Sequence, residues 1–278
     1  MQSLLEVMDI ASGDRQTVYR TPDHIEAPNW SRDGAYFLFN GNGLLYRLPA
    51  AGGTPVKIDT GPLARLNNDH GISPDGKWIA ISDKSDPDDK SRISILPAEG
   101  GAPRLVTREG PSYWHGWSPD GKTLAYVAAR GNRILNLYAC PAEGGLETRL
   151  TDTDGLDDGP DYSPDGRFVY FNSTRSGNMK LWRIPSGGGD PEQLTFEDET
   201  RDWFPHPSPD GRWIVFVSFG TDVAISDHPP GKNVALRLMR TSGGAPRVIA
   251  HLYGGQGTLN VPSWSPDGHR FAFVSYEA

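Results

Sequence analysis

The stretch Ser163-Pro-Asp-Gly-Arg-Phe-Val-Tyr-Phe171 decides the fold. Its first four residues have the chemistry of a turn: proline presets φ, aspartate accepts hydrogen bonds from nearby backbone N–H groups, and glycine takes the positive φ that closes the turn. The residues that follow are aromatic and β-branched, as is typical of strands. The stretch therefore predicts a hairpin turn that leads into a β-strand.

This turn recurs along the whole chain. Ser-Pro-Asp-Gly occurs at 73–76, 118–121, 163–166, 208–211 and 265–268, and Ser31-Arg-Asp-Gly34 is a sixth, variant copy. Successive turn aspartates are 42, 45, 45, 45 and 57 residues apart, which is the length of a four-stranded propeller blade. We interpret the six aspartates as structural turn residues, not catalytic ones.

A second, glycine-rich turn alternates with the first, as in Ala98-Glu-Gly-Gly101, so each repeat has four strands. The first such turn, at Gly13, precedes every Ser-Pro-Asp-Gly copy, whereas none follows the last copy. We expect residues 3–20 to supply the two outer strands of the blade whose inner strands lie within 259–276. The sequence predicts an all-β, six-bladed β-propeller of four-stranded antiparallel blades, with residues 1–278 as one domain.

Composition excludes several classes of protein. The 278 residues include 33 Gly and 24 Pro, which disfavours a mostly helical chain. The net charge of −8 disfavours nucleic acid as a partner. Cys140 is the single cysteine, so an intramolecular disulfide and cysteine-rich zinc sites are excluded.

Membrane insertion and export are not expected either. No apolar stretch approaches the 18 residues of a membrane span, the richest being residues 213–217. The N-terminal residues lack the basic and apolar regions of a signal peptide. We therefore expect a cytoplasmic protein, or a periplasmic one if the start is truncated.

Ser-Pro-Asp-Gly followed by an aromatic or aliphatic strand resembles the TolB-like class of WD-type propeller repeats, and this resemblance covers essentially the whole chain. It implies the propeller fold, and the fold by itself does not give a function. TolB itself carries an additional N-terminal α/β domain, whereas the blades here start within the first few residues. Prolyl-oligopeptidase-type propellers also share the repeat, but no Gly-x-Ser-x-Gly motif of a serine peptidase occurs.

Candidate ligand-binding residues are found by aligning the repeats on the turn aspartate. In a propeller, the loops that precede the innermost strands gather around one mouth of the central channel. Seven residues before each turn aspartate the side chains are polar or aromatic: Glu26, Asn68, Tyr113, Asp158, Trp203 and Asn260. Three residues before it, in contrast, Trp30, Ile72, Trp117, Tyr162 and Trp264 predict packing between blades.

Three histidines share the same zone. His70 and His115 lie five residues before a turn aspartate, and His206 lies four before one. Imidazoles from separate blades could hold a divalent metal ion beside Asp158 as a base. This set resembles the oligogalacturonate lyases, which hold a metal on channel histidines and a glutamine, a part that Gln256 could take. Hydrogen-bonded channel histidines without a metal are the alternative.

The fifth repeat is longer than the others because of residues 219–232. We expect this loop to overhang the channel mouth and present Asp227 and His228, as a lid or specificity loop or as a tolerated surface insertion. In the fourth repeat, Arg175 and Lys180 could pair with an anionic ligand.

Two functions remain open from the sequence. The first is a binding or protein-interaction module whose loop face takes up a protein or a small polar or carbohydrate ligand. The second is a metal-assisted lyase or hydrolase that acts on an acidic oligosaccharide.

Overall fold

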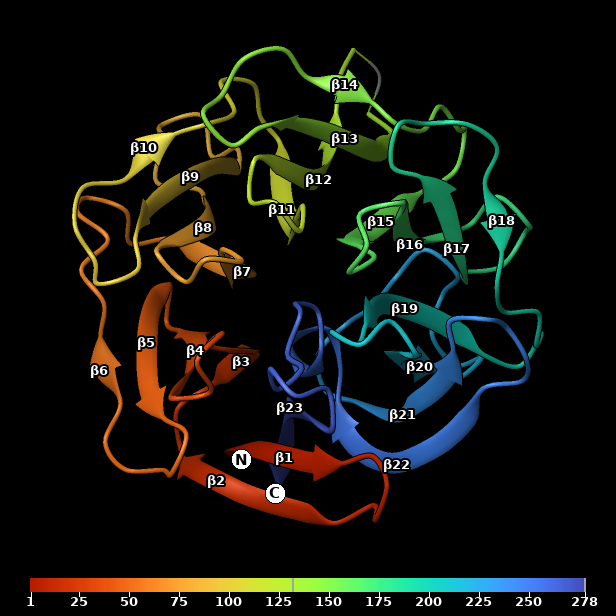
Figure 1. Ribbon diagram of the computed structural model, residues 1–278, viewed down its shortest axis with the longest axis horizontal. Coiled ribbons are helices and arrows are strands. Elements are labelled where there is room, and N and C mark those ends of the chain that lie inside the picture. The colour runs from red at the N-terminus through yellow and green to blue at the C-terminus, as the bar shows by residue number, and fades with distance from the viewer. Residues whose placement is uncertain (132, 278) are drawn as a thin grey trace.

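The computed structural model describes residues 1–131 and 133–277, and its β-sheets form a ring of six blades around a central channel (Figure 1). Five blades have four antiparallel strands each, in chain order from the channel outward. Blade 1 is β3 (Ile25–Trp30), β4 (Tyr36–Gly41), β5 (Leu44–Pro49) and β6 (Val56–Lys57); blade 2 is β7 (Leu66–Ile72), β8 (Trp78–Asp83), β9 (Arg92–Pro97) and β10 (Arg104–Leu105); blade 3 is β11 (Ser112–Trp117), β12 (Thr123–Ala129), β13 (Leu135–Pro141) and β14 (Thr148–Arg149); blade 4 is β15 (Asp157–Tyr162), β16 (Phe168–Ser173), β17 (Lys180–Pro185) and β18 (Glu192–Gln193); blade 5 is β19 (Arg201–Pro207), β20 (Trp213–Phe219), β21 (Lys232–Arg240) and β22 (Arg247–Gly254).

Blade 6 joins the two ends of the chain, as the sequence predicts. The strand β23 (Arg270–Glu277) pairs antiparallel with β1 (Gln2–Asp9), and β1 pairs with β2 (Arg15–Thr21). The N- and C-termini accordingly lie close together in Figure 1. In this three-stranded sheet β1 lies between β2 and β23, so the pairing of the two chain ends closes the ring.

The innermost strand expected in blade 6 is replaced by an irregular segment, residues 255–263, which we call the channel segment. It contains the short helix η1 (Gln256–Thr258), and only an isolated bridge from Trp264 to Phe271 remains of the expected pairing. Other blades hold this segment: the Asn260 amide donates to the backbone oxygen of Asn68 at 3.1 Å, and the Asn29 amide donates to the Pro262 oxygen. These contacts draw the segment into the ring (Figure 1).

The six repeated turns share one hydrogen-bond pattern. In blade 4, the Ser163 hydroxyl donates to Asp165 Oδ1 at 2.6 Å, and the same Oδ1 accepts the Arg167 N–H at 3.1 Å. The Ser163 hydroxyl also accepts the N–H of Phe168 at 2.9 Å. Equivalent serine–aspartate contacts occur in the other five turns. The structural interpretation of the turn aspartates is therefore confirmed.

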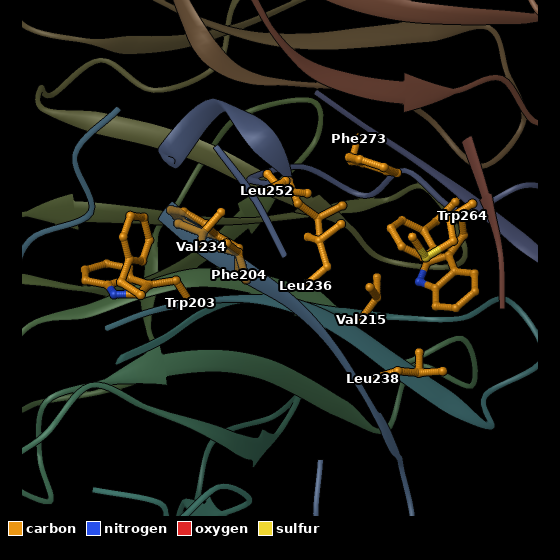
Figure 2. Close-up of a cluster of buried hydrophobic side chains, with 14 of the residues drawn as sticks. Trp203, Phe204, Val215, Val234, Leu236, Leu238, Leu252, Trp264 and Phe273 are labelled. Carbon is orange, nitrogen blue, oxygen red and sulfur yellow. The ribbon is translucent and has the colours of Figure 1, made fainter. Parts of the chain in front are cut away.

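Aromatic and aliphatic side chains fill the space between neighbouring blades. Figure 2 shows one such cluster, in which Trp203, Val215 and Leu236 of blade 5 belong to the same buried group as Trp264 and Phe273 of blade 6. The five residues predicted to pack between blades are all buried: Trp30, Ile72, Trp117, Tyr162 and Trp264. Burial of such side chains is the main favourable contribution to the stability of the fold. None of the described helices is long and apolar enough to span a bilayer.

Candidate functional site

Irregular backbone in the innermost strands positions the side chains of the site. Each innermost strand of blades 1 to 5 has a shift of register four to nine residues before its turn aspartate. In three of them, the residue six before that aspartate has a positive φ: 58° at Ala27, 61° at Gly159 and 56° at Phe204. Such bulges change the direction in which side chains point; the residues that precede Ala27 and Gly159, namely Glu26 and Asp158, face the channel mouth.

A cavity of about 620 Å³ lies at this mouth, and we call it the upper cavity. All six blades contribute to its lining, through the starts of innermost strands, the loops between second and third strands, and the channel segment. The lining residues are His24, Glu26, Asn40, Gly41, Asn42, Gly43, Leu66, Asn67, Asn68, Asp69, Lys84, Tyr113, His115, Leu135, Asp158, Phe204, His228 and Gln256. This size falls within the roughly 300–1,000 Å³ typical of small-molecule sites.

Two carboxylates flank one imidazole in the upper cavity. Nε2 of His115 lies 3.1 Å from Asp158 Oδ1 and 4.0 Å from Asp69 Oδ1. All three side chains are buried. Asp69 also accepts hydrogen bonds from the Asn67 and Asn260 amides, at 2.5 and 3.1 Å. The group therefore brings together blades 2, 3 and 4 and is tied to the channel segment.

The three groups ionise differently because their partners differ. Burial raises the pKa of Asp69 to about 6, although the nearby His115 opposes this shift. Burial would also raise the pKa of Asp158, but the hydrogen bond with His115, the charges of His115 and His228 and the Gly159 N–H together outweigh burial, and the pKa lies below the ordinary value. Burial by itself lowers the pKa of His115, whereas the bond to Asp158 and the charge of Asp69 raise it above the ordinary value. Near neutral pH, Asp158 is the ionised acid, and Asp69 is the one poised to gain or lose a proton.

Aromatic rings form one wall of the cavity. The His228 imidazole stacks on Trp203 with ring centroids 4.2 Å apart, and it meets the edge of Phe204 at 5.4 Å. Phe204 stacks in turn on His115 at 6.0 Å. The long loop of blade 5 thus reaches the cavity, as expected, while its Asp227 is exposed and bonds the backbone N–H of His228.

The structure brings most of the residues selected from sequence into one place. Seven of them line the upper cavity: Glu26, Asn68, Tyr113, His115, Asp158, His228 and Gln256. Trp203 and Asn260 are fully buried and support the lining from behind. Arg175 is instead paired with Asp157 at 2.9 and 3.0 Å, and the buried Lys180 lies 3.4 Å from Asp202. Both cations therefore already have partners within the protein.

The three histidines selected as metal ligands do not form a ligand set. Among residues 1–131 and 133–277, no three His, Cys, Asp or Glu side chains are arranged to hold a metal ion. His206 uses both ring nitrogens, with Nδ1 3.0 Å from Asp161 Oδ2 and Nε2 3.1 Å from the Leu259 oxygen. His70 is fully buried in the interior, where burial lowers its pKa to about 4. Hydrogen bonds of the kind expected in the alternative are made by His206, through both ring nitrogens, and by Nε2 of His115 with Asp158.

Several residues that line the cavity were not selected by the alignment of the repeats. Asp69 lies directly after the selected Asn68, yet the register shift of β7 places both side chains on the cavity. Asn40 lies near the end of β4, and Lys84 lies in the loop after β8. Phe204 has the same offset from its turn as Ala27 and Gly159 and shares their positive φ, but of these three residues it alone lines the cavity. The pairs of asparagines at 40 and 42 and at 67 and 68 were the available sequence signal for these additional lining residues, because side-chain amides are concentrated at those positions.

Comparisons with known proteins decide the family. The model of the TolB beta propeller domain matches residues 115–229. An uncharacterised protein of Agrobacterium fabrum is 51% identical over 277 residues, which is 99% of this chain and 93% of the relative. The chain belongs to the TolB-like β-propeller family.

Solved structures of the TolB-like family agree with the fold. A TolB-type protein from Agrobacterium tumefaciens is 50% identical, superimposes with a TM-score of 0.96, and covers 100% of this chain and 99% of its own. TolB from Acinetobacter baumannii (19% identity, TM-score 0.65, 88% of this chain and 65% of its own) and an oligogalacturonate lyase in complex with manganese (14%, 0.61, 96% and 77%) share the fold alone.

Proposed function

We propose that this TolB-like propeller is a binding module that takes up a small, hydroxyl-rich ligand of the carbohydrate class in the upper cavity. One observation carries the proposal: side chains from all six blades line a single cavity whose polar groups include amides, carboxylates and imidazoles. Amide groups both donate and accept hydrogen bonds, as a hydroxyl does. The rings of Tyr113 and Phe204, and that of His228 at the edge of Phe204, supply apolar surface beside these polar groups.

The charges of the lining favour a ligand without a large net charge. Glu26, Asp69 and Asp158 supply acids, and His115 and Lys84 supply groups of opposite sign in the same cavity. Lys84 Nζ lies 5.9 Å from the centre of the Tyr113 ring, so its charge also reaches the lining. Because the lining holds both acidic and basic groups, it is more complementary to a polar neutral ligand than to one of large net charge.

Binding of disaccharides tests this proposal. Cellobiose, chitobiose and digalacturonate serve as neutral, N-acetylated and acidic probes in titration calorimetry with the full chain. Saturable binding of at least one probe is expected, weakened about tenfold or more in Tyr113→Ala and in His228→Ala because each removes an apolar face. Tyr253→Ala is the matched control, since Tyr253 is exposed and lies outside the upper cavity. If no probe saturates, or if the cavity variants bind as tightly as the control, the proposal fails.

A second candidate function is acid–base chemistry on the bound ligand, and the different ionisation of Asp69 and Asp158 favours it. Asp69, with a pKa of about 6, suits the role of base better than Asp158, which the sequence suggested. Cleavage of digalacturonate by the chain, lost in Asp69→Asn and kept in Asp227→Asn, would support this function. Binding without any turnover would leave the binding module alone.

A further inference from the structure

The opposite end of the channel holds a second cavity, of about 250 Å³, which we call the lower mouth. The two cavities are separated by the channel segment, since Gln256 lines the upper one and Pro262 the lower. Prolines of the repeated turns and aromatic residues three positions before the turn aspartates form half of its lining: Pro74, Pro119, Pro164, Pro209, Trp30, Trp117, Tyr162 and Trp264. These faces are flat and apolar.

Arg32 breaks this pattern. It occupies the second position of the variant turn Ser31-Arg-Asp-Gly34, where the other five turns have proline. The turn itself is unchanged, because Ser31 still donates to Asp33 Oδ1 at 2.7 Å and Asp33 still accepts the N–H of Ala35. The turn therefore does not require arginine at this position. Arginine in place of proline puts one guanidinium group among the proline and aromatic side chains of the lower mouth.

This guanidinium group has no ion-pair partner in the part of the chain that the structure describes, where Asp161 is the one charge that acts on it. Asp161 is itself engaged, with Oδ2 3.0 Å from His206 Nδ1. Nε2 of His206 donates its hydrogen to the Leu259 oxygen at 3.1 Å, and burial raises the pKa of Asp161 above the ordinary value. Arg32 is the one arginine or lysine among the described residues that line the lower mouth.

We propose that the lower mouth binds a small organic monoanion, namely a carboxylate carried on a flat apolar group. The planar fork of an arginine matches the two oxygens of a carboxylate. The rings of Trp30, Trp117 and Trp264 offer the apolar body its contacts. A cavity of about 250 Å³ admits only a small ligand, and a single guanidinium group favours a monoanion over a phosphate dianion. This site is independent of the function proposed for the upper cavity.

Titration with benzoate tests the site, with the indole N–H signals of the tryptophans as reporters in ¹H–¹⁵N spectra of the full chain. The indoles of Trp117 and Trp264 donate to the oxygens of Gly71 and His206 at 3.1 and 2.9 Å, so they are ordered reporters at the lower mouth. Benzoate is expected to shift the signals of Trp30, Trp117 and Trp264 saturably. The signal of Trp213, which does not line the lower mouth, is expected to stay in place.

Two variants of Arg32 decide the role of its charge. Arg32→Pro restores the residue of the other turns and Arg32→Gln keeps a polar side chain; both are expected to weaken benzoate binding about tenfold or more, because a charge-assisted pair is lost. Arg167→Gln is the matched control, since Arg167 follows another such turn and pairs with Asp165 at 2.6 Å. Dispersed indole signals without ligand show that each variant is folded.

The matched ligand control is benzamide, which has the same shape without the charge. The proposal is overturned if benzamide shifts the same signals with equal affinity, if both Arg32 variants bind benzoate as the unaltered chain does, or if no signal saturates.

Discussion

The upper cavity and the lower mouth are two ends of one channel, built from the same innermost strands. They differ in how similar the residues are that successive blades contribute. At the lower mouth the repeats contribute nearly identical prolines and aromatic residues, with Arg32 as the exception. At the upper cavity each blade contributes a different side chain. The turn and the packing between blades constrain the lower end in every repeat, whereas the upper end is free to vary and therefore to acquire a specific ligand.

The pKa values of the turn aspartates and of Asp69 are shifted in opposite directions. At the lower end, hydrogen bonds from serine hydroxyls and backbone N–H groups hold the pKa of the turn aspartates below the ordinary value. At the upper end, burial raises the pKa of Asp69 to about 6. Ionisation of a turn aspartate therefore stabilises the folded state, whereas ionisation of Asp69 destabilises it.

The largest expected effect on stability is at Gly71, in the innermost strand β7 of blade 2. A methyl group added at Gly71 would overlap the buried indole of Trp114, which lines the lower mouth. Gly71→Ala is therefore expected to lower the free energy of unfolding by about 3 kcal/mol, as overpacking of a rigid core does. Urea denaturation measures this. Gly187→Ala is the control, because Gly187 has open space around it; equal stability of the two variants would contradict the packing described here.

The next largest effect concerns the channel segment that separates the two ends. Asn260 is fully buried and its amide donates to the Asn68 oxygen and to Asp69 Oδ1. Asn260→Ala leaves two buried acceptors without a donor and is expected to cost about 2 kcal/mol of unfolding free energy. Thermal denaturation of this variant beside that of Asn233→Ala, which alters an exposed asparagine, checks the value. A loss no greater than that of the control would show that the segment is not held by this residue.

A third test exploits the raised pKa of Asp69. Its carboxyl ionises near pH 4 in the unfolded chain but near pH 6 in the fold, so its contribution to stability falls as the pH rises from about 4 to 6. Asp69→Asn is expected to flatten the stability profile in this window, and denaturation at several pH values measures the slope. Asp227→Asn, which alters an exposed acid, should keep the original slope. An unchanged slope in Asp69→Asn would refute the assignment.

The smallest effect is expected at a single repeated turn. Asp165→Ala removes the acceptor of the Ser163 hydroxyl and of the Arg167 N–H, at a cost of about 1 kcal/mol or less because the site is exposed. The pKa of Asp165 is lowered to about 2, so its stabilising contribution is present above pH 4 and is lost as the pH falls toward 2. Denaturation at pH 7 and pH 2.5 should show that the free energy of unfolding lost in Asp165→Ala is smaller in acid. Asp190→Asn, which alters an exposed acid outside these turns, is expected to lose none.

Much of this arrangement could be predicted from the repeats. The residue types around each Ser-Pro-Asp-Gly copy determine a turn between two strands, and their period determines a blade. The position seven residues before the turn led to Glu26, Asn68, Tyr113 and Asp158, which do line one cavity. A residue such as Asp69 was missed because an alternating strand would direct it away from its neighbour, and a bulge is not visible in the spacing of residues.

The sequence by itself determined the number of blades, the closure of the ring by the N-terminal strands and the structural role of the turn aspartates, because local turn chemistry and a regular period are sufficient for these. Only the tertiary structure decided which channel side chains meet. Contacts among residues far apart in the chain settle that: Asn260 drawn to blade 2, His206 held by Asp161, and His115 shared by Asp69 and Asp158. Such contacts depend on backbone bulges and on burial, and both arise only once the six blades pack around a common axis.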